Sequence, residues 1–395
     1  MSIRLKKNKE KAVLNYHPWI FSGAIEKEEP GLTPGQTVRV LSYEGKFLAW
    51  GHYAPDSQIR IRLFSFEEAE SDLNPGFWTR RWESVYRSKK EWLDPKFTNS
   101  FRFLHSEGDL SPGFIVDCYA NAAVMQLRTP GSKLHKEELV SFLKEKGFTT
   151  VLEKGEKSDS GEPAHLQWYC GDEKQVRFLE NGHSFLADLE NGQKTGFFLD
   201  QRENRSLLGK FAKGKKVLNT FGYSGAFSVY ALANGAESVH TLDISKSAID
   251  LCAQNLGLNF SEEWIQSKHK GLVSDSFRYL KEMEAGAYDL IILDPPAFTK
   301  HISTVNQATR GYKDINLKAM SKIKPGGIIF TFSCSQHISP DLFKKIVFGA
   351  AKDAGKRVRV LYQMTQGPDH GFSIFHPEGE YLKGLVIQVD SFVSD

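Results

Sequence analysis

A short glycine-containing turn followed by an acidic residue suggests a site for a nucleoside. The turn is Gly222-Tyr223-Ser224-Gly225, and Asp243 lies 21 residues after its first glycine. A ligand can approach backbone N–H groups closely where no Cβ intervenes, and a carboxylate at this distance can bind both ribose hydroxyls. The third glycine of the dinucleotide fingerprint is absent, so a cofactor with one nucleoside and no pyrophosphate, such as S-adenosylmethionine (AdoMet), fits better. The alternative is a β-α-β unit whose turn needs glycine for packing alone.

A second group of residues could act on a flat substrate. Asp294 precedes Pro295 and Pro296, which remove two N–H donors and make the turn rigid. The Asp294 carboxylate and the turn carbonyls could hydrogen-bond the edge of a base, and Phe298 could stack on it. Cys334 lies between two serines just before a helix, where thiolate character is favoured. Methylation at carbon-5 of a pyrimidine needs such a nucleophile at carbon-6, whereas methylation of a base nitrogen needs only Asp294 and the turn.

These residues follow segments with the pattern of buried strands. Such segments lie at 216–220, 237–243, 288–293 and 328–332. Helical segments alternate with them, which predicts an α/β chain with a doubly wound, Rossmann-like sheet. Because the carboxyl ends of parallel strands meet at one edge of a sheet, the candidate residues should lie together there. Asp275 ends another short run and should lie at the same edge.

The first part of the chain has a different pattern. Short strands are expected at 37–41, 46–50 and 58–63. In the last of these, apolar and basic residues alternate, which predicts a small β-barrel with basic residues outside over roughly 1–72. An aromatic helix near 77–87 opens a further region, which ends with a hairpin signal at Asn181-Gly182. Residues 154–164 are expected to form a surface loop.

Length and composition limit the other possibilities. The chain has 395 residues, more than one core usually serves, so several domains are expected. Four widely spaced cysteines without a C-x-x-C pair are typical of a reduced, cytoplasmic protein without a zinc or other metal site. No stretch approaches 18 consecutive apolar residues, so no membrane span is expected. The net charge of +3 means that any basic surface is local.

Seven segments, taken in order, resemble the bacterial large-subunit ribosomal RNA methyltransferase I family, which makes 5-methylcytosine in 23S ribosomal RNA. The segments are 17–23, 196–202, 219–225, 294–298, 311–316, 332–335 and 377–384. The resemblance covers essentially the whole chain. It implies a PUA-like RNA-binding domain over 1–72, a central α/β domain over 73–185 and a class I methyltransferase domain over 186–395.

The resemblance also implies roles for individual residues. Cys334 would be the nucleophile. The residue types, and not the resemblance, assign Asp294 to the base edge and either Asp294 or Glu378 to removal of the carbon-5 proton. By resemblance, Asp243 and Asp275 would hold the ribose and adenine of AdoMet. The cofactor-binding residues expected on this basis are Asn219, Phe221, Gly222, Ser224, Gly225, Asp243, Asp275 and Asp294. Many 5-methylcytosine enzymes carry a second cysteine directly after the Asp-Pro turn, and this chain has Ala297-Phe298 there.

The expected partner is ribosomal RNA, free or in a large-subunit precursor. The candidate phosphate contacts are Arg4, Lys6, Lys7, Lys9, Arg60 and Arg62. Such a charge run can also be a solvated face. Two other functions stay open: a base-nitrogen methyltransferase in which Cys334 is structural, and a non-catalytic RNA-binding assembly factor. The target nucleotide and the oligomeric state, with a homodimer among the alternatives, are also left open.

Overall fold

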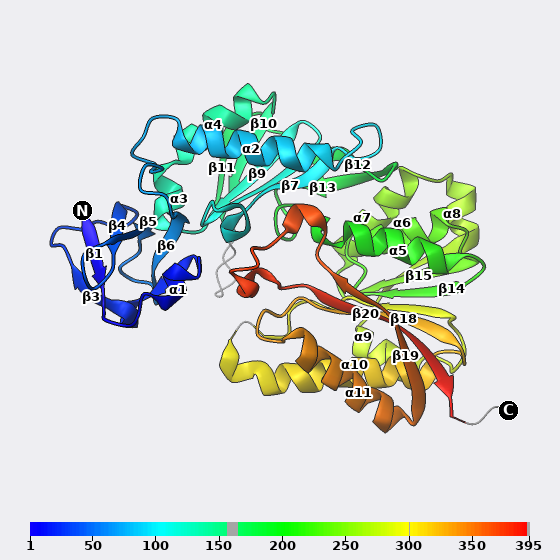
Figure 1. The fold of residues 1–395 in the computed structure, drawn as a ribbon. Coiled ribbons are helices and arrows are strands. Elements are labelled where there is room, and N and C mark those ends of the chain that lie inside the picture. Colours follow the sequence, from blue (N-terminus) through cyan, green and yellow to red (C-terminus); the bar gives the residue numbers. More distant parts are fainter. Residues whose placement is uncertain (156–164, 300, 393–395) are drawn as a thin grey trace. The chain divides into compact units, whose positions relative to one another are not determined.

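The computed structural model describes residues 1–155, 165–299 and 301–392, and this part of the chain divides into two compact units (Figure 1). The first unit contains residues 1–179, 187–199 and 368–379. The second contains 180–186, 200–367 and the C-terminal residues from 380. The surface loop expected at 154–164 lies, from residue 156 onward, outside the described residues. Among the described helices, none has the length and apolar character needed to cross a membrane.

The N-terminal part of the first unit is a mixed sheet with the strand order β2-β6-β5-β4-β1-β3. Its elements are β1 (Ser2–Leu5), α1 (Lys11–Leu14), β2 (Trp19–Phe21), β3 (Ile25–Glu28), β4 (Thr37–Leu41), β5 (Phe47–Tyr53) and β6 (Ile59–Ser65). Ile61 and Leu63 of β6 are fully buried, whereas the intervening Arg62 is half-buried. The alternation read from the sequence is therefore confirmed, because one face of β6 packs into the core.

The central part of the first unit has its own sheet, with the strand order β11-β10-β9-β8-β7. Its elements are α2 (Phe77–Glu91), β7 (Ser100–His105), β8 (Phe114–Tyr119), β9 (Ala122–Leu127), α3 (Pro130–Leu134), α4 (Lys136–Glu145), β10 (Thr150–Lys154) and β11 (Leu166–Cys170). Trp78 and Trp82 of α2 are buried and stack with their ring centroids 5.7 Å apart. This confirms the aromatic helix and the face on which it packs.

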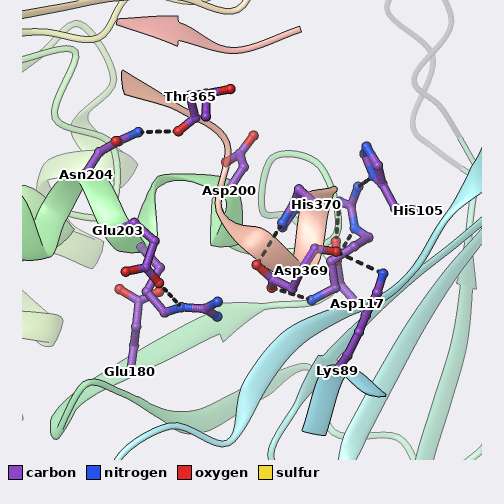
Figure 2. Close-up of polar contacts among 12 residues, drawn as sticks. Lys89, His105, Asp117, Glu180, Asp200, Glu203, Asn204, Thr365, Asp369 and His370 are labelled. Atoms are coloured by element: carbon purple, nitrogen blue, oxygen red, sulfur yellow. Dashed lines mark hydrogen bonds and ion pairs between the residues drawn. The ribbon is translucent and has the colours of Figure 1, made fainter. Parts of the chain in front are cut away.

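A late segment of the chain, residues 368–379, belongs to the first unit. The Asp369 carboxylate accepts a hydrogen bond from the Arg102 N–H at 2.9 Å, and its carbonyl accepts one from the Lys89 ammonium at 2.9 Å. Arg102 is also paired with the buried Asp117 at 2.5 Å. Figure 2 shows Asp369, Lys89 and Asp117 meeting in this network. Buried charges are stable only when they are paired in this way, so the segment is fixed to the sheet of β7 and β8.

The chain passes between the two units at a hairpin of β12 (Gln175–Glu180) and β13 (His183–Asp188). Asn181 and Gly182 form its turn with φ values of 48° and 82°. Two successive residues with positive φ are what a type I′ turn requires. The hairpin expected from Asn181-Gly182 is confirmed.

The second unit contains a doubly wound sheet with the strand order β16-β15-β14-β17-β18-β20-β19. Its strands are β14 (Lys216–Thr220), β15 (Ser238–Asp243), β16 (His269–Val273), β17 (Leu290–Leu293), β18 (Gly327–Ser333), β19 (Lys356–Thr365) and β20 (Lys383–Ser391). The strands from β14 to β18 are parallel, and β20 is antiparallel to both of its neighbours. The expected Rossmann-like sheet is therefore present.

Helices cover both faces of this sheet. They are α5 (Arg202–Ala212), α6 (Ala226–Ala233), α7 (Lys246–Gly257), α8 (Glu262–Lys268), α9 (Ser276–Glu282), α10 (Val305–Lys322) and α11 (Pro340–Ala354). Helices α5, α6 and α7 lie on one face, and α9, α10 and α11 lie on the other (Figure 1). The second face buries a cluster that includes Leu293, Ile315 and Ile346. With both faces covered, only the strand ends remain to form a site.

Candidate functional site

The predicted site residues follow the carboxyl ends of neighbouring strands in the second unit. Strand β14 pairs with β15 on one side and with β17 on the other, so the strand order reverses there. Sheets of this type bind ligands in the crevice at such a reversal. The loop after β14, Asp243 of β15, Asp294 after β17 and Cys334 after β18 therefore share one edge of the sheet.

The loop after β14 has an unusual backbone conformation. Phe221 and Tyr223 have φ values of 56° and 42°, in the left-handed region that residues with a Cβ rarely adopt. The Asp243 carboxylate accepts a hydrogen bond from the Tyr223 N–H at 3.0 Å and holds the loop in this form. Strain of about 1–3 kcal/mol per residue persists only where the surroundings enforce it, and it is concentrated at ligand sites.

The two glycines of this loop are required by packing. A Cβ on Gly222 would lie 2.3 Å from the Thr241 methyl carbon, and one on Gly225 would lie 2.2 Å from the Cys252 sulfur. Gly225 also has a φ of +69°. Contact with β15 and α7 therefore explains both glycines, as in the alternative left open by the sequence. Close approach of a ligand to the loop stays a prediction.

Asp243 and Asp275 are fixed by backbone groups. The second carboxylate oxygen of Asp243 accepts from the Ser245 N–H at 2.9 Å. Asp275 caps α9 by accepting from the Arg278 N–H at 2.8 Å. Each carboxylate oxygen has two lone pairs, so both side chains can accept further hydrogen bonds from a ligand. Their positions suit hydroxyl or amino donors at the sheet edge.

Asn219 and Ser224 support the loop from the protein interior. Asn219 is 1% exposed and donates from its amide to the Ser228 hydroxyl at 2.9 Å. The Ser228 hydroxyl is 2.7 Å from that of Thr241 on the next strand. Ser224 is buried, and its carbonyl accepts from the Asn255 amide at 2.8 Å. The Asn219 side chain and the Ser224 backbone carbonyl therefore both help to shape the loop.

The Asp294 carboxylate is oriented by a residue to which the sequence analysis gave no role. The Gln201 amide donates to an Asp294 oxygen at 3.0 Å. Gln201 is itself held by the Asn204 amide, which is 2.6 Å from the Gln201 oxygen. Asn204 also donates to the Thr365 carbonyl at 3.1 Å, as Figure 2 shows. This chain of hydrogen bonds fixes Asp294 before any substrate arrives.

Phe298, expected to stack on a base, packs against other aromatic rings. Its ring centroid is 4.5 Å from that of Tyr312 and 5.9 Å from that of Phe277. The side chain is half-buried. The prediction that it stacks on a substrate therefore concerns only the part that remains exposed.

Cys334 lies beside the proline turn. Its sulfur is 3.9 Å from the Pro295 carbonyl oxygen, and the residue is half-buried. Cys118 and Cys252 are fully buried, and burial raises the pKa of both thiols, that of Cys252 to about 12. Such thiols stay protonated and unreactive. Among these three cysteines, Cys334 alone combines partial exposure with a position at the strand ends.

Two further side chains lie next to Cys334. Lys383, at the start of β20, donates from its ammonium to the Ser335 carbonyl at 2.7 Å. Tyr312 of α10 is fully buried, and its hydroxyl is 2.8 Å from that of Ser335. Both residues lie in the segments 311–316 and 377–384 that carry the family resemblance. Their contacts join segments far apart in the chain, so no local pattern of residues indicated a role for them.

Glu378, the alternative proton acceptor, belongs to the first unit. Its carboxylate is 3.3 Å from the His17 ring nitrogen and 3.8 Å from that of His376. The Glu378 side chain is 42% exposed. In the first unit it therefore lies in a histidine cluster with the N-terminal segment 17–23.

The predicted RNA contacts fall into two groups. Arg4, Lys6, Lys7 and Lys9 are exposed. Arg60 and Arg62 are instead half-buried beside carboxylates: Arg60 is 3.8 Å from Glu28, and Arg62 forms an ion pair with the buried Glu107. A neutralised, half-buried cation attracts a phosphate less than an exposed one does. The N-terminal run is therefore the better-placed candidate for phosphate contacts.

The first unit also contains a histidine–aspartate cluster that the sequence did not reveal. His52 and His135 lie 2.7 and 3.0 Å from the same Asp72 oxygen, and the ligand atoms of the three residues lie within 4.8 Å of one another. This spacing could hold a metal ion. The observed contacts are those of two imidazole N–H groups donating to one carboxylate, which keeps the pKa of Asp72 below its ordinary value despite burial. The cluster links β5 to the helices α3 and α4.

Comparison with known families matches two parts of the chain. Residues 140–369 match a family described as S-adenosylmethionine-dependent methyltransferase. Residues 3–66 match the PUA-like domain. The first match spans the sheet edge that holds the candidate residues.

Related proteins match over nearly the whole chain. A protein of Alteromonas mediterranea, named ribosomal RNA large subunit methyltransferase I, is 38% identical over 98% of both chains. A protein of the same name from Pseudoalteromonas atlantica is 39% identical over 98% of this chain and 99% of its own. A solved Streptococcus mutans structure assigned to the SAM-dependent methyltransferases shares the fold, with a TM-score of 0.82, 23% identity and coverage of 98% of this chain and 100% of its own.

Proposed function

Since the chain belongs to the ribosomal RNA large subunit methyltransferase I family, whose members depend on AdoMet, we propose that it methylates carbon-5 of a cytosine in 23S ribosomal RNA through a covalent bond from Cys334. The observation that carries this proposal is the position of the Cys334 thiol, 3.9 Å from the Pro295 carbonyl in the Asp294 turn. A nucleophile and a group that can hold a base edge are thereby adjacent. An enzyme that methylates a base nitrogen would need only the group that holds the base edge, and no nucleophile.

The residues at the sheet edge fit AdoMet, which supplies an activated methyl group. Asp243 lies at the end of β15 with both oxygens already aligned by backbone N–H groups. From there it accepts hydrogen bonds from the ribose hydroxyls, and Asp275 accepts from the adenine. The loop at 219–225 binds the methionine part with Phe221, Gly222 and Gly225, while Asn219 and Ser224 support it from below.

Cys334 makes carbon-5 of the cytosine reactive. Its thiolate attacks carbon-6, so a sulfur–carbon bond forms and the electrons of the carbon-5–carbon-6 double bond move into the ring. Carbon-5 then becomes enamine-like and accepts the methyl group. The target base must leave its stack to reach the thiol. Asp294, held by Gln201 at 3.0 Å, receives the pairing edge of that base.

Product release requires a base to remove the carbon-5 proton. When this proton leaves, its bonding electrons restore the double bond and expel the Cys334 thiolate. Asp294 is one candidate, although a carboxylate already bonded to the base edge is poorly aimed at carbon-5. Glu378 is the other, and its contact with His17 at 3.3 Å gives it a local partner for the proton.

RNA binding is assigned mainly to the PUA-like domain. The exposed Arg4 lies in β1, and the exposed Lys6, Lys7 and Lys9 follow that strand. Exposed cations bind phosphates by releasing counterions, which gives affinity without reading sequence. Selection of the target cytosine is then a task for the catalytic domain.

Nucleoside mapping by mass spectrometry in a deletion strain tests the function. The account expects one 5-methylcytosine to disappear from 23S ribosomal RNA and to return with wild-type protein, but not with Cys334→Ala. A matched control, Cys170→Ala, removes the half-buried cysteine that ends β11 in the first unit and should restore the methyl group. Loss of a nitrogen methylation instead, or no change in any modification, would replace this function with one of the two alternatives.

A further inference from the structure

Lys383 is a buried cation at the start of β20, beside the end of β18 that precedes Cys334. It is 4% exposed, and the antiparallel register of β18 and β20 pairs it with Ser333. Its ammonium donates to the Ser335 carbonyl at 2.7 Å. Lys383 therefore contacts the residues on both sides of Cys334, one through strand pairing and the other through its side chain.

The charge of Lys383 lacks the compensation that buried cations usually have. Among the described residues, no carboxylate lies within ion-pair distance of its ammonium. Burial lowers the pKa of Lys383 to about 8, and the nearby Cys334 and Glu380 act in the opposite direction. Burying an unpaired charge is costly, so a lysine in this position is better explained by an anion that forms beside it.

Two other side chains face this position, and one of them, Glu380, is a carboxylate that favours the charged form of Lys383 without forming an ion pair with it. Burial raises the pKa of Tyr312, so its hydroxyl stays neutral. That hydroxyl is 2.8 Å from the Ser335 hydroxyl and helps to hold the backbone after Cys334. Glu380 is half-buried and lines, with Lys383 and Lys344, a cavity of about 240 Å³ between α11, β19 and β20. The group left to become anionic next to Lys383 is the Cys334 thiol.

We propose that Lys383 is a positioning residue that stabilises the thiolate of Cys334 and so makes it nucleophilic. The proposal rests on the proposed function and adds the means of activation. The thiol proton of Cys334 is transferred to a water molecule, and the electron pair of the S–H bond stays on sulfur. The ammonium of Lys383 stabilises the resulting negative charge on the sulfur. A nearby cation favours the charged form of a cysteine and lowers its pKa.

The test measures the reactivity of Cys334 itself. The rate of alkylation of Cys334 by iodoacetamide is followed against pH in the full-length protein, with the modified peptide identified by mass spectrometry. A free cysteine has a pKa of about 8.5, and the apparent pKa of Cys334 in the wild type should lie below this value. Lys383→Gln keeps an N–H donor for the Ser335 carbonyl but removes the charge. It should raise the apparent pKa of Cys334 by about one unit or more, and slow alkylation at pH 7 by about tenfold.

Two further variants separate charge from packing. Lys383→Arg keeps a cation and should retain most of the wild-type reactivity. Lys344→Gln removes an exposed lysine from the same cavity, whose ammonium is 3.8 Å from Asp341, and should leave the profile unchanged. AdoMet binding by calorimetry confirms that each variant is folded.

Specific results would overturn the proposal. They are an unchanged Cys334 profile in a folded Lys383→Gln variant, or a wild-type Cys334 whose apparent pKa is that of a free cysteine or higher. The second result decides the question even if Lys383→Gln fails to fold. Failure of the proposed function is a separate outcome, because it would appear as methylation by Cys334→Ala whatever the reactivity of the thiol.

Discussion

Removal of the Asp243 carboxylate should weaken AdoMet binding and loosen the loop that surrounds the cofactor. Asp243 accepts from the Tyr223 N–H at 3.0 Å and the Ser245 N–H at 2.9 Å. In Asp243→Ala both N–H groups lose this acceptor, and the unfavourable φ of 42° at Tyr223 loses one of the contacts that hold it. Each lost hydrogen bond costs about 0.5–1.5 kcal/mol, so we expect a loss of about 1–3 kcal/mol in the free energy of unfolding.

The effect on AdoMet affinity adds to this loss and is measured separately. Hydrogen bonds from the ribose hydroxyls to a carboxylate contribute about 1–3 kcal/mol, so the Kd for AdoMet should rise by about fivefold to 150-fold. Isothermal titration calorimetry measures the Kd, and thermal unfolding without AdoMet measures the stability. Asp250→Ala is the matched control, because Asp250 is an exposed carboxylate of α7 bonded to Lys246 at 2.9 Å. It should change neither quantity appreciably.

The reasoning fails if folded Asp243→Ala binds AdoMet with wild-type affinity. In that case the carboxylate only supports the loop, and the ribose must be held elsewhere. Loss of affinity in Asp250→Ala of the same size would show that net charge, and not the position of Asp243, determines binding.

Three other predictions follow from the contacts described. Replacing Lys6, Lys7 and Lys9 by glutamine should lower the magnitude of the salt slope of RNA binding by roughly one unit for each lysine that contacts a phosphate. Equal salt slopes for the wild type and this triple variant would show that the lysine run is only a solvated face. Arg62→Gln should leave the salt slope unchanged and instead destabilise the protein by about 3 kcal/mol, because the buried Glu107 loses its partner. Glu378→Gln should form the covalent RNA adduct but release it slowly, and normal turnover would leave proton removal to Asp294 or water. Gln201→Ala should lower kcat by about tenfold with unchanged AdoMet affinity, because the Asp294 carboxylate loses a charge-assisted hydrogen bond. A changed AdoMet affinity with an unchanged kcat would contradict the role of Gln201 in holding Asp294.

Periodicity predicted the elements of the second unit well. The alternation of buried strands and helices placed Asp243, Asp294 and Cys334 at strand ends, where the structure has them. The start of α11 could be predicted from two adjacent residues. Ser339 accepts from the Leu342 N–H at 3.2 Å, and Pro340 occupies the first helical position, as expected for such a pair. Signals of this kind depend on a few neighbouring residues and survive in any context.

Contacts between distant segments could not be read from the sequence. Residues 187–199 and 368–379 belong to the first compact unit, although they lie far along the chain from most of its other residues. The pairing of Asp369 with Arg102 is the kind of contact responsible, since it joins residues 267 positions apart. The same is true of Gln201 with Asp294. Arg60 and Arg62 were correctly placed on one face of a strand, but their carboxylate partners belong to other segments.

The glycine loop shows a different limit of sequence reasoning. Gly222 and Gly225 were read as making room for a ligand, and the structure shows that Thr241 and Cys252 already occupy the space that a Cβ would need. Close backbone packing and ligand approach both select glycine, so the residue type does not separate them. Only the distances from the glycine to its neighbouring atoms show that close packing requires a residue without a Cβ there.

A covalent adduct between Cys334 and its RNA would be direct evidence for nucleophilic catalysis by this cysteine. A 23S RNA fragment in which 5-fluorocytidine replaces cytidine is incubated with AdoMet and the protein, denatured, and separated by gel electrophoresis. Fluorine at carbon-5 prevents the final loss of a proton, so the sulfur–carbon bond at carbon-6 should persist. The wild type should give a denaturation-resistant complex that maps to the Cys334 peptide, and Cys334→Ala should give none. Methylation without such a complex, or substantial turnover by Cys334→Ala, would contradict nucleophilic catalysis by Cys334.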